Sequence, residues 1–177
     1  MAYLTINNLT SRTFTKANSL NESISARTYL EKKVFLSYRR MDRDYVDGVV
    51  RFLKRLGVAV YIDYLDETLE EKTNDVVAQQ LRDRIKECSK FITLATPNST
   101  NSKWMPWELG LGDRIINYAN VAILPLTNDP NNWSDQEYGK IYGRIESANS
   151  FSIANSDDWY LIYPNNARVK FKDWLNK

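Results

Sequence analysis

A single acidic side chain, Glu108, lies between two tryptophans and two glycines in the segment 102–112 (SKWMPWELGLG). The segment follows an apolar run and predicts the start of a helix, because Pro106 is tolerated in a first turn, where its missing N–H costs nothing. Possible capping residues precede it: Ser99, Asn101 and Ser102. Glu108 is then expected near the positive end of the helix. An isolated glutamate at this position is more often an ordinary first-turn residue. Whether Glu108 has a catalytic role therefore depends on the residues around it in the fold.

Histidine is absent from the 177-residue chain. Its absence excludes Ser-His-Asp and Cys-His nucleophile systems, HExxH metal sites and histidine phosphotransfer. Any catalysis must therefore use carboxylates, a Lys, Tyr or Ser side chain, or a bound cofactor. Cys88 falls on the apolar face of an expected helix, which favours a small core residue over a nucleophile.

The composition is that of an ordinary globular domain, with 43% hydrophobic and 26% charged residues. A net charge of +2 with interspersed signs does not indicate a nucleic-acid partner. The lone cysteine excludes an internal disulfide and a cysteine-rich metal site, and it is typical of a reducing, cytoplasmic location. No apolar run reaches membrane-spanning length and the N-terminus lacks the apolar core of a signal peptide, so no membrane partner is expected.

Short apolar runs alternate with amphipathic segments through the middle of the chain. The runs expected to form buried strands are 33–38, 58–62, 91–95 and 121–126. From Asp44 to Gly57, and again from Asp75 onward, apolar residues recur at helical spacing. Asp42 or Asp44 can cap the first of these helices and Gly57 can end it. This order predicts right-handed βαβ units and a parallel sheet.

The two ends of the chain give weaker patterns. Residues 1–31 are rich in Ser, Thr and Asn and are expected to form a polar N-terminal arm or a short helix, with a single domain over 32–177. A short helix over 135–144, a fifth strand over 159–163 and a last helix after Asn165 or Asn166 are expected. The prediction is an α/β, flavodoxin-like fold with a five-stranded parallel sheet, strand order 2-1-3-4-5, and helices on both faces.

Ligands of such a sheet bind where the strands end, so the residues there limit the function. The turn after the first strand, 37–40 (SYRR), has neither the glycines of a dinucleotide-binding turn nor those of a P-loop. It also lacks the acids of a phospho-receiver domain and the hydroxyl- and glycine-rich loop of an FMN site.

Three segments resemble the sequence boxes of Toll/interleukin-1 receptor (TIR) domains, in the family's order and spacing within 33–126. They are 34–40 (VFLSYRR), 60–63 (VYID) and 102–109 (SKWMPWEL). The acidic stretch 64–74 lies where the family has its BB loop, and it lacks the glycine that this loop often contains.

The resemblance implies a TIR fold and an activity. Trp104 and Glu108 are similar to the tryptophan and the catalytic glutamate of NAD-cleaving TIR domains, and Ser37, Tyr38, Arg39 and Arg40 are similar to the end of the first strand in the axon-degeneration TIR enzyme. The chain looks most like prokaryotic TIR proteins, including those of Thoeris-type antiphage defence, which make cyclic ADP-ribose isomers. NAD+ would be the substrate, with no other cofactor.

The resemblance also implies partners. Many members of the family work by stacking into filaments in which a neighbour's BB loop completes the site, so self-association through the TIR domain is implied here. A downstream effector that senses the nucleotide product is expected as well.

The implied chemistry suits a chain without histidine. Ordinary glycosidases need a second carboxyl group to protonate the leaving oxygen. In NAD+ the leaving group is a pyridinium that departs as neutral nicotinamide, so one carboxylate can stabilise the oxocarbenium-like transition state. Trp104 or Tyr38 can stack on the nicotinamide, and Arg39 or Arg40 can pair with the pyrophosphate.

Other interpretations stay open from the sequence alone. Trp104 can be a core or interface residue, Arg39 a solvated loop cation, and Asp63 a cap for the loop after its strand. The alternative function is a non-catalytic TIR scaffold that acts by self-association or by docking to another TIR domain.

Overall fold

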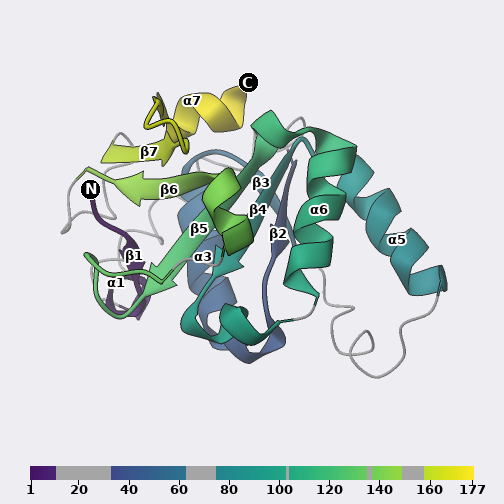
Figure 1. The fold of residues 1–177 in the computed structure, drawn as a ribbon, viewed down its shortest axis with the longest axis horizontal. Helices are drawn as coiled ribbons and strands as arrows, with labels where there is room; N and C mark the ends of the chain where they lie inside the picture. Colours follow the sequence, from purple (N-terminus) through teal and green to yellow (C-terminus); the bar gives the residue numbers. More distant parts are fainter. Residues whose placement is uncertain (11–32, 63–74, 103, 135–136, 149–157) are drawn as a thin grey trace.

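The computed structural model describes residues 1–10, 33–62, 75–102, 104–134, 137–148 and 158–177. Within these residues, an eight-stranded sheet runs through the molecule with helices on both of its faces (Figure 1). The strand order is β3-β2-β4-β5-β6-β7-β8, and the short strand β1 pairs with β5 outside this path.

The parallel part of the sheet matches the prediction. Its strands are β2 (Lys33–Ser37), β3 (Ala59–Ile62), β4 (Lys90–Ala95), β5 (Val121–Thr127) and β6 (Gly143–Ser147). The helices between them are α3 (Arg43–Arg55), α5 (Asp75–Lys86) and α6 (Met105–Ile116). Counted from β2, the order is 2-1-3-4-5, so the flavodoxin-like α/β fold is confirmed.

The prediction of five strands was wrong. The fifth parallel strand is β6, while β7 (Trp159–Ile162) runs antiparallel to β6, and β8 (Arg168–Lys170) runs antiparallel to β7. The expected helix over 135–144 is a 3-10 turn, η5 (Glu137–Ile141), followed directly by β6. The last helix, α7 (Phe171–Asn176), begins later than expected because β8 precedes it.

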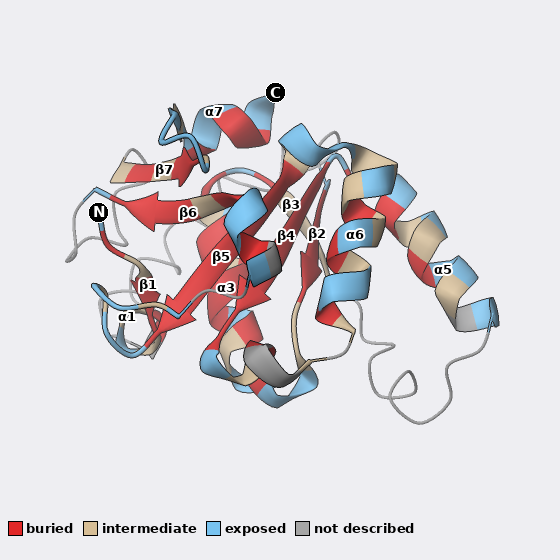
Figure 2. Ribbon diagram, in the orientation of Figure 1, coloured by how far each residue is buried: buried red, intermediate tan, exposed pale blue. Residues whose placement is uncertain are grey.

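The sheet separates two apolar clusters, because successive side chains of a strand point to opposite faces. Val34 and Leu36 pack in the cluster that contains the buried side of α3, whereas Phe35 packs in the cluster that contains the buried sides of α5 and α6. The central strands are buried along most of their length and the helices expose their outer sides (Figure 2).

The first residues of the chain belong to this core. In β1 (Leu4–Thr5), Leu4 is fully buried and pairs with Leu126 of β5. In α1 (Ile6–Thr10), Leu9 lies so close to α3 that a Cβ on Gly48 would be 3.0 Å from the Leu9 Cβ. The remainder of the expected arm lies outside the described residues.

Candidate active site

Ser37 and Glu108 meet at the carboxyl ends of the strands. Ser37 is the last residue of β2 and shares its face with Phe35, which packs towards α6. The Ser37 hydroxyl donates a hydrogen bond of 2.5 Å to Glu108 Oε2, although the two residues are 71 positions apart. Ser37 is buried and Glu108 is partly buried. The parallel strand β2 and the first turn of α6 thus bring a hydroxyl and a carboxylate together.

The start of α6 follows from the loop after β4. Thr96 caps the 3-10 turn η3 (Pro97–Asn101) in a capping box with Ser99. The Met105 N–H then donates to Ser102 Oγ at 3.2 Å, so Ser102 supplies the oxygen expected of a cap at the start of α6. Glu108 lies in the first helical turn, where the helix dipole favours a negative charge.

Trp104 lies one helical turn before Glu108, and the Glu108 N–H donates to its carbonyl oxygen at 2.9 Å. The partly buried Trp104 ring makes an edge contact with Trp107, with ring centroids 5.6 Å apart and planes at 84°. Residues four apart lie on the same face of a helix. An indole is therefore placed on the face of α6 that carries the carboxylate.

The remaining predicted site residues are distributed around this pair. Tyr38 packs against the cluster on the α3 side, away from the face that Ser37 shares with Phe35. The Arg39 guanidinium donates to the carbonyl of Asn98 in η3, and Arg40 is exposed. Asp63 and the acidic stretch 64–74 lie outside the described residues. Among the described members of the set, only Ser37, Trp104 and Glu108 gather at the start of α6.

Asp42 lies at the expected N-cap position of α3, but its side chain bonds elsewhere. It was expected as a possible cap of α3, but its carboxylate makes no capping hydrogen bond to that helix. It is fully buried and accepts hydrogen bonds from Thr96 Oγ1 and Asn98 Nδ2, both at 2.7 Å. An aspartate before a helix resembles a cap in the sequence, and only the order of β2 and β4 in the sheet brings it to Asn98.

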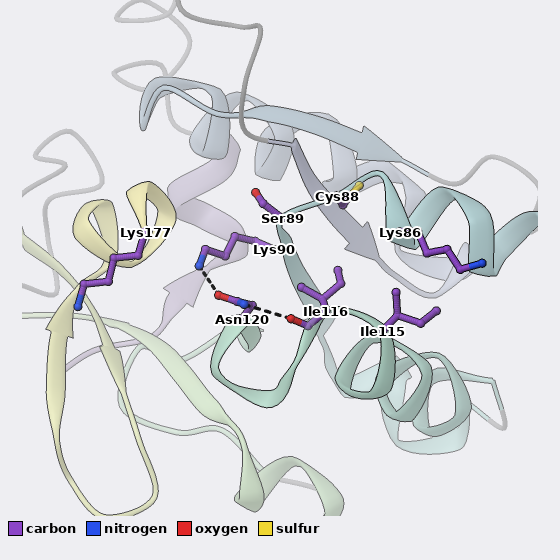
Figure 3. Close-up of a pocket in the computed structure, with 8 residues that line it drawn as sticks. All are labelled: Lys86, Cys88, Ser89, Lys90, Ile115, Ile116, Asn120 and Lys177. Carbon is purple, nitrogen blue, oxygen red and sulfur yellow. Dashed lines mark hydrogen bonds between the residues drawn. The ribbon is translucent and has the colours of Figure 1, made fainter.

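A pocket of about 380 Å³ lies at the opposite end of the strands (Figure 3). Lys90 directs its ammonium group to Asn120 Oδ1 and also lies over the Trp174 ring, 4.7 Å from its centroid. Asn120 Nδ2 donates to the Ile116 carbonyl, and Lys86 pairs with Asp83 at 3.0 Å. The polar side chains of Lys90, Asn120 and Lys86 thus bond to other groups of the chain.

Within the described residues, no three His, Cys, Asp or Glu side chains gather to hold a metal ion. No helix in the same parts of the chain is both long and apolar enough to cross a membrane.

Comparison with known proteins identifies the family. The family model for the TIR domain matches residues 34–158, a range that includes both Ser37 and Glu108. The chain is 30% identical over 149 residues to a protein of Bacillus cereus (strain MSX-D12) named "Probable 3' cyclic ADP-D-ribose synthase ThsB'". That alignment covers 81% of this chain and 75% of the Bacillus protein. The chain therefore belongs to the TIR domain family.

Proposed function

We propose that the protein cleaves NAD+ at the bond between nicotinamide and ribose, and releases nicotinamide with ADP-ribose or a cyclic isomer of it. The observation that carries this proposal is the Glu108 carboxylate, which lies partly buried at the carboxyl edge of the sheet and is oriented by the Ser37 hydroxyl. The similarity to a probable cyclic ADP-ribose synthase supports the same substrate.

The reaction breaks the C–N glycosidic bond, and its electron pair leaves with nicotinamide, which becomes neutral. Positive charge then develops on the ribose, where a fixed carboxylate in a site shielded from water stabilises it. Glu108 has this role in the proposal, and it also accepts hydrogen bonds from the ribose hydroxyls. Because the leaving group departs without a proton, no general acid is needed.

The other predicted residues bind the substrate. Trp104, on the same helix face as Glu108, stacks on the nicotinamide ring. Arg39 or Arg40 pairs with the pyrophosphate through charge-assisted hydrogen bonds. Tyr38 and Asp63 remain predicted substrate contacts, and Tyr38 would have to turn from the α3 side to make one.

The second product depends on which nucleophile reaches the anomeric carbon. Attack by water gives ADP-ribose, whereas attack by a group of the adenine or of a ribose gives a cyclic isomer. The name of the Bacillus relative favours cyclisation. The product would then be a signal for a downstream effector, as in the Thoeris-type antiphage systems that the sequence resembles, and self-association through the TIR domain would accompany activation.

The test is incubation of the purified protein with NAD+ over a range of protein concentrations, followed by chromatography and mass analysis. Nicotinamide is expected in all active samples, and ADP-ribose differs from its cyclic isomers by the mass of one water. Glu108→Gln should lower kcat by about 10²-fold or more, because it removes the charge that stabilises the transition state.

Glu87→Gln is the matched control. This variant makes the same substitution, glutamate to glutamine, at an exposed position near the amino ends of the strands. Glu87 pairs there with Lys33 at 3.7 Å. The variant should leave NAD+ cleavage unchanged. Wild-type rates in Glu108→Gln would contradict the assignment of Glu108, and a wild-type protein that never cleaves NAD+ at any concentration would favour the scaffold function.

A further inference from the structure

The proposed reaction leaves the fully buried Asp42 carboxylate without a role. Asp42 ends the 3-10 turn η2 (Arg40–Asp42), where an aspartate can cap the next helix, yet its side chain makes no such bond. Its oxygens accept instead from Thr96 Oγ1 and Asn98 Nδ2, each at 2.7 Å. A buried carboxylate is costly unless it is hydrogen-bonded, so these bonds hold the two loops together.

Arg39, Asp42 and Asn98 form a closed circuit. The Asp42 N–H donates to the Arg39 carbonyl at 2.8 Å, Asn98 Nδ2 donates to the Asp42 carboxylate, and the Arg39 guanidinium donates to the Asn98 carbonyl. Thr96 reinforces the circuit, because its hydroxyl donates to Asp42 and accepts from the Asn98 N–H at 3.1 Å. The loop after β2 is thereby bound to the loop after β4.

We propose that Asp42 is a positioning residue that holds the Arg39 guanidinium ready for the pyrophosphate of NAD+, by fixing the Asn98 carbonyl to which Arg39 is bound. This inference rests on the proposed function. A guanidinium has five N–H donors, so one bond to a carbonyl orients the group and does not exhaust it. A pre-oriented cation loses less side-chain entropy when the substrate binds.

The location of the circuit supports this role. Arg39 lies two residues after Ser37, and η3, which contains Asn98, leads through Ser102 into α6 and Glu108. Asp42 therefore joins the two chain segments that carry the catalytic carboxylate and the phosphate-binding cation. Loss of its charge should weaken substrate binding and leave the bond-breaking step largely intact.

The first test is Asp42→Asn, which keeps the shape of the side chain and removes its charge. The KM for NAD+ should rise about five- to tenfold, while kcat changes less than about twofold. This rise is smaller than the roughly 10- to 100-fold expected for direct loss of a charged hydrogen bond to the substrate, because Asp42 acts only through Arg39. Arg39→Ala should raise KM at least as much. Adding Asp42→Asn to Arg39→Ala should cause no further rise, because both changes act through the same guanidinium.

The exchange Asp42→Asn with Asn98→Asp is the rescue. In this double variant, the amide nitrogen at position 42 donates to the carboxylate at position 98, and the amide oxygen at position 42 still accepts from Thr96 Oγ1. The circuit is thus restored, with the hydrogen bond between positions 42 and 98 running in the opposite direction. KM should return to within about twofold of wild type. If Asp42 acts independently of Arg39, the effects of Asp42→Asn and Arg39→Ala on KM should add in free energy. Such additivity would overturn the proposal.

If Asp42→Asn fails to fold, Asn98→Ala replaces it. Asn98 is partly exposed, and the substitution removes the amide donor while keeping the main-chain carbonyl. KM should again rise, and an unchanged KM in a folded variant would overturn the positioning role. If Glu108→Gln abolishes NAD+ cleavage but Asp42→Asn leaves its kinetics unchanged, this inference alone is rejected. If the wild type does not cleave NAD+, the proposed function and this inference are rejected together.

Discussion

The hydrogen bond from Ser37 to Glu108 is the contact on which the proposed chemistry most depends. A carboxylate at the end of a long side chain samples several rotamers, and only some of them bring its oxygens to a substrate. The Ser37 hydroxyl is held by a buried strand end and fixes Glu108 Oε2 at 2.5 Å. A pre-oriented charge stabilises the transition state without reorganisation during the reaction.

Ser37→Ala is therefore expected to lower kcat for NAD+ cleavage by about tenfold, because the carboxylate loses the donor that orients it. The fold should persist, because the substitution removes only the Ser37 hydroxyl oxygen. The partner of this hydroxyl, the Glu108 carboxylate, is partly exposed and can bind water instead. Steady-state kinetics and a melting temperature measure both effects.

Ser89→Ala is the control for this prediction. Ser89 is exposed and donates its hydroxyl to the Lys33 carbonyl at 3.2 Å, near the amino ends of the strands. It should leave kcat unchanged. Equal kinetics for Ser37→Ala and the wild type would show that Glu108 needs no orienting donor.

At the scale of secondary-structure elements, the sequence predicted the strands that are continuous apolar runs and the helices whose apolar residues recur at helical spacing. Strands β2, β3, β4 and β5 are short apolar runs, and α3 has a regular apolar face, so both could be located. Strand β6 could not, because its Arg144 and Glu146 interrupt the apolar pattern. These two side chains pair at 3.1 Å, which allows a charged segment to be buried beside β5.

The candidate site divides in the same way. The start of α6 and the place of Glu108 followed from local signals, namely a serine before the helix and a proline in its first turn. The contact of Glu108 with Ser37 and that of Asp42 with Asn98 each join residues from different strands and loops. Such contacts depend on strand order and register, which a pattern of single residues does not specify.

Two glycines of α6 give a test of how this helix is held. A Cβ on Gly112 would lie 2.7 Å from the Phe91 ring, whereas a Cβ on Gly110 would meet nothing within 4 Å. Gly112→Ala should therefore push α6 away from β4 and cost about 1–3 kcal/mol of stability. Gly110→Ala should stabilise the protein by about 0.5–1 kcal/mol, because alanine is the better helix former.

The kinetics should separate the same pair. A displaced α6 moves Glu108 away from Ser37, so Gly112→Ala should lower kcat, while Gly110→Ala should not. Chemical denaturation and NAD+ turnover measure the two effects. Equal stability of both variants would show that the close contact between Gly112 and Phe91 does not set the position of α6.

At the scale of the whole molecule, segments from both ends of the sequence complete the core around the parallel strands. Leu4 is buried against β5, and Phe171 and Trp174 of α7 are buried in the same cluster. Trp174 Nε1 also donates to the Ala119 carbonyl at 2.7 Å, beside the start of β5. The strand ends that carry the candidate site are thus supported by a core that extends across the described parts of the chain.

This core should make the protein less stable at alkaline pH. Burial raises the pKa of the Cys88 thiol from 9.0 to about 11, and burial together with a hydrogen bond to Asp113 raises the pKa of Tyr142 from 10.0 to about 12. Below pH 9 both groups are protonated in the folded and the unfolded chain, so they cause no pH dependence. Between pH 9 and 11 the unfolded chain loses the thiol proton that the folded chain keeps, so stability falls as pH rises.

Cys88→Ala isolates the contribution of the thiol. Between pH 9 and 11 the wild type should lose more unfolding free energy than this variant, by an amount on the order of 2 kcal/mol. Denaturant unfolding at pH 8, 9, 10 and 11 measures the difference, and the remaining decline of the variant includes Tyr142 and Tyr163, because burial raises the pKa of both phenols. Parallel curves for the two proteins would mean that the Cys88 thiol ionises as readily in the folded protein as in the unfolded chain, and that the packing of α5 against the sheet admits water to it.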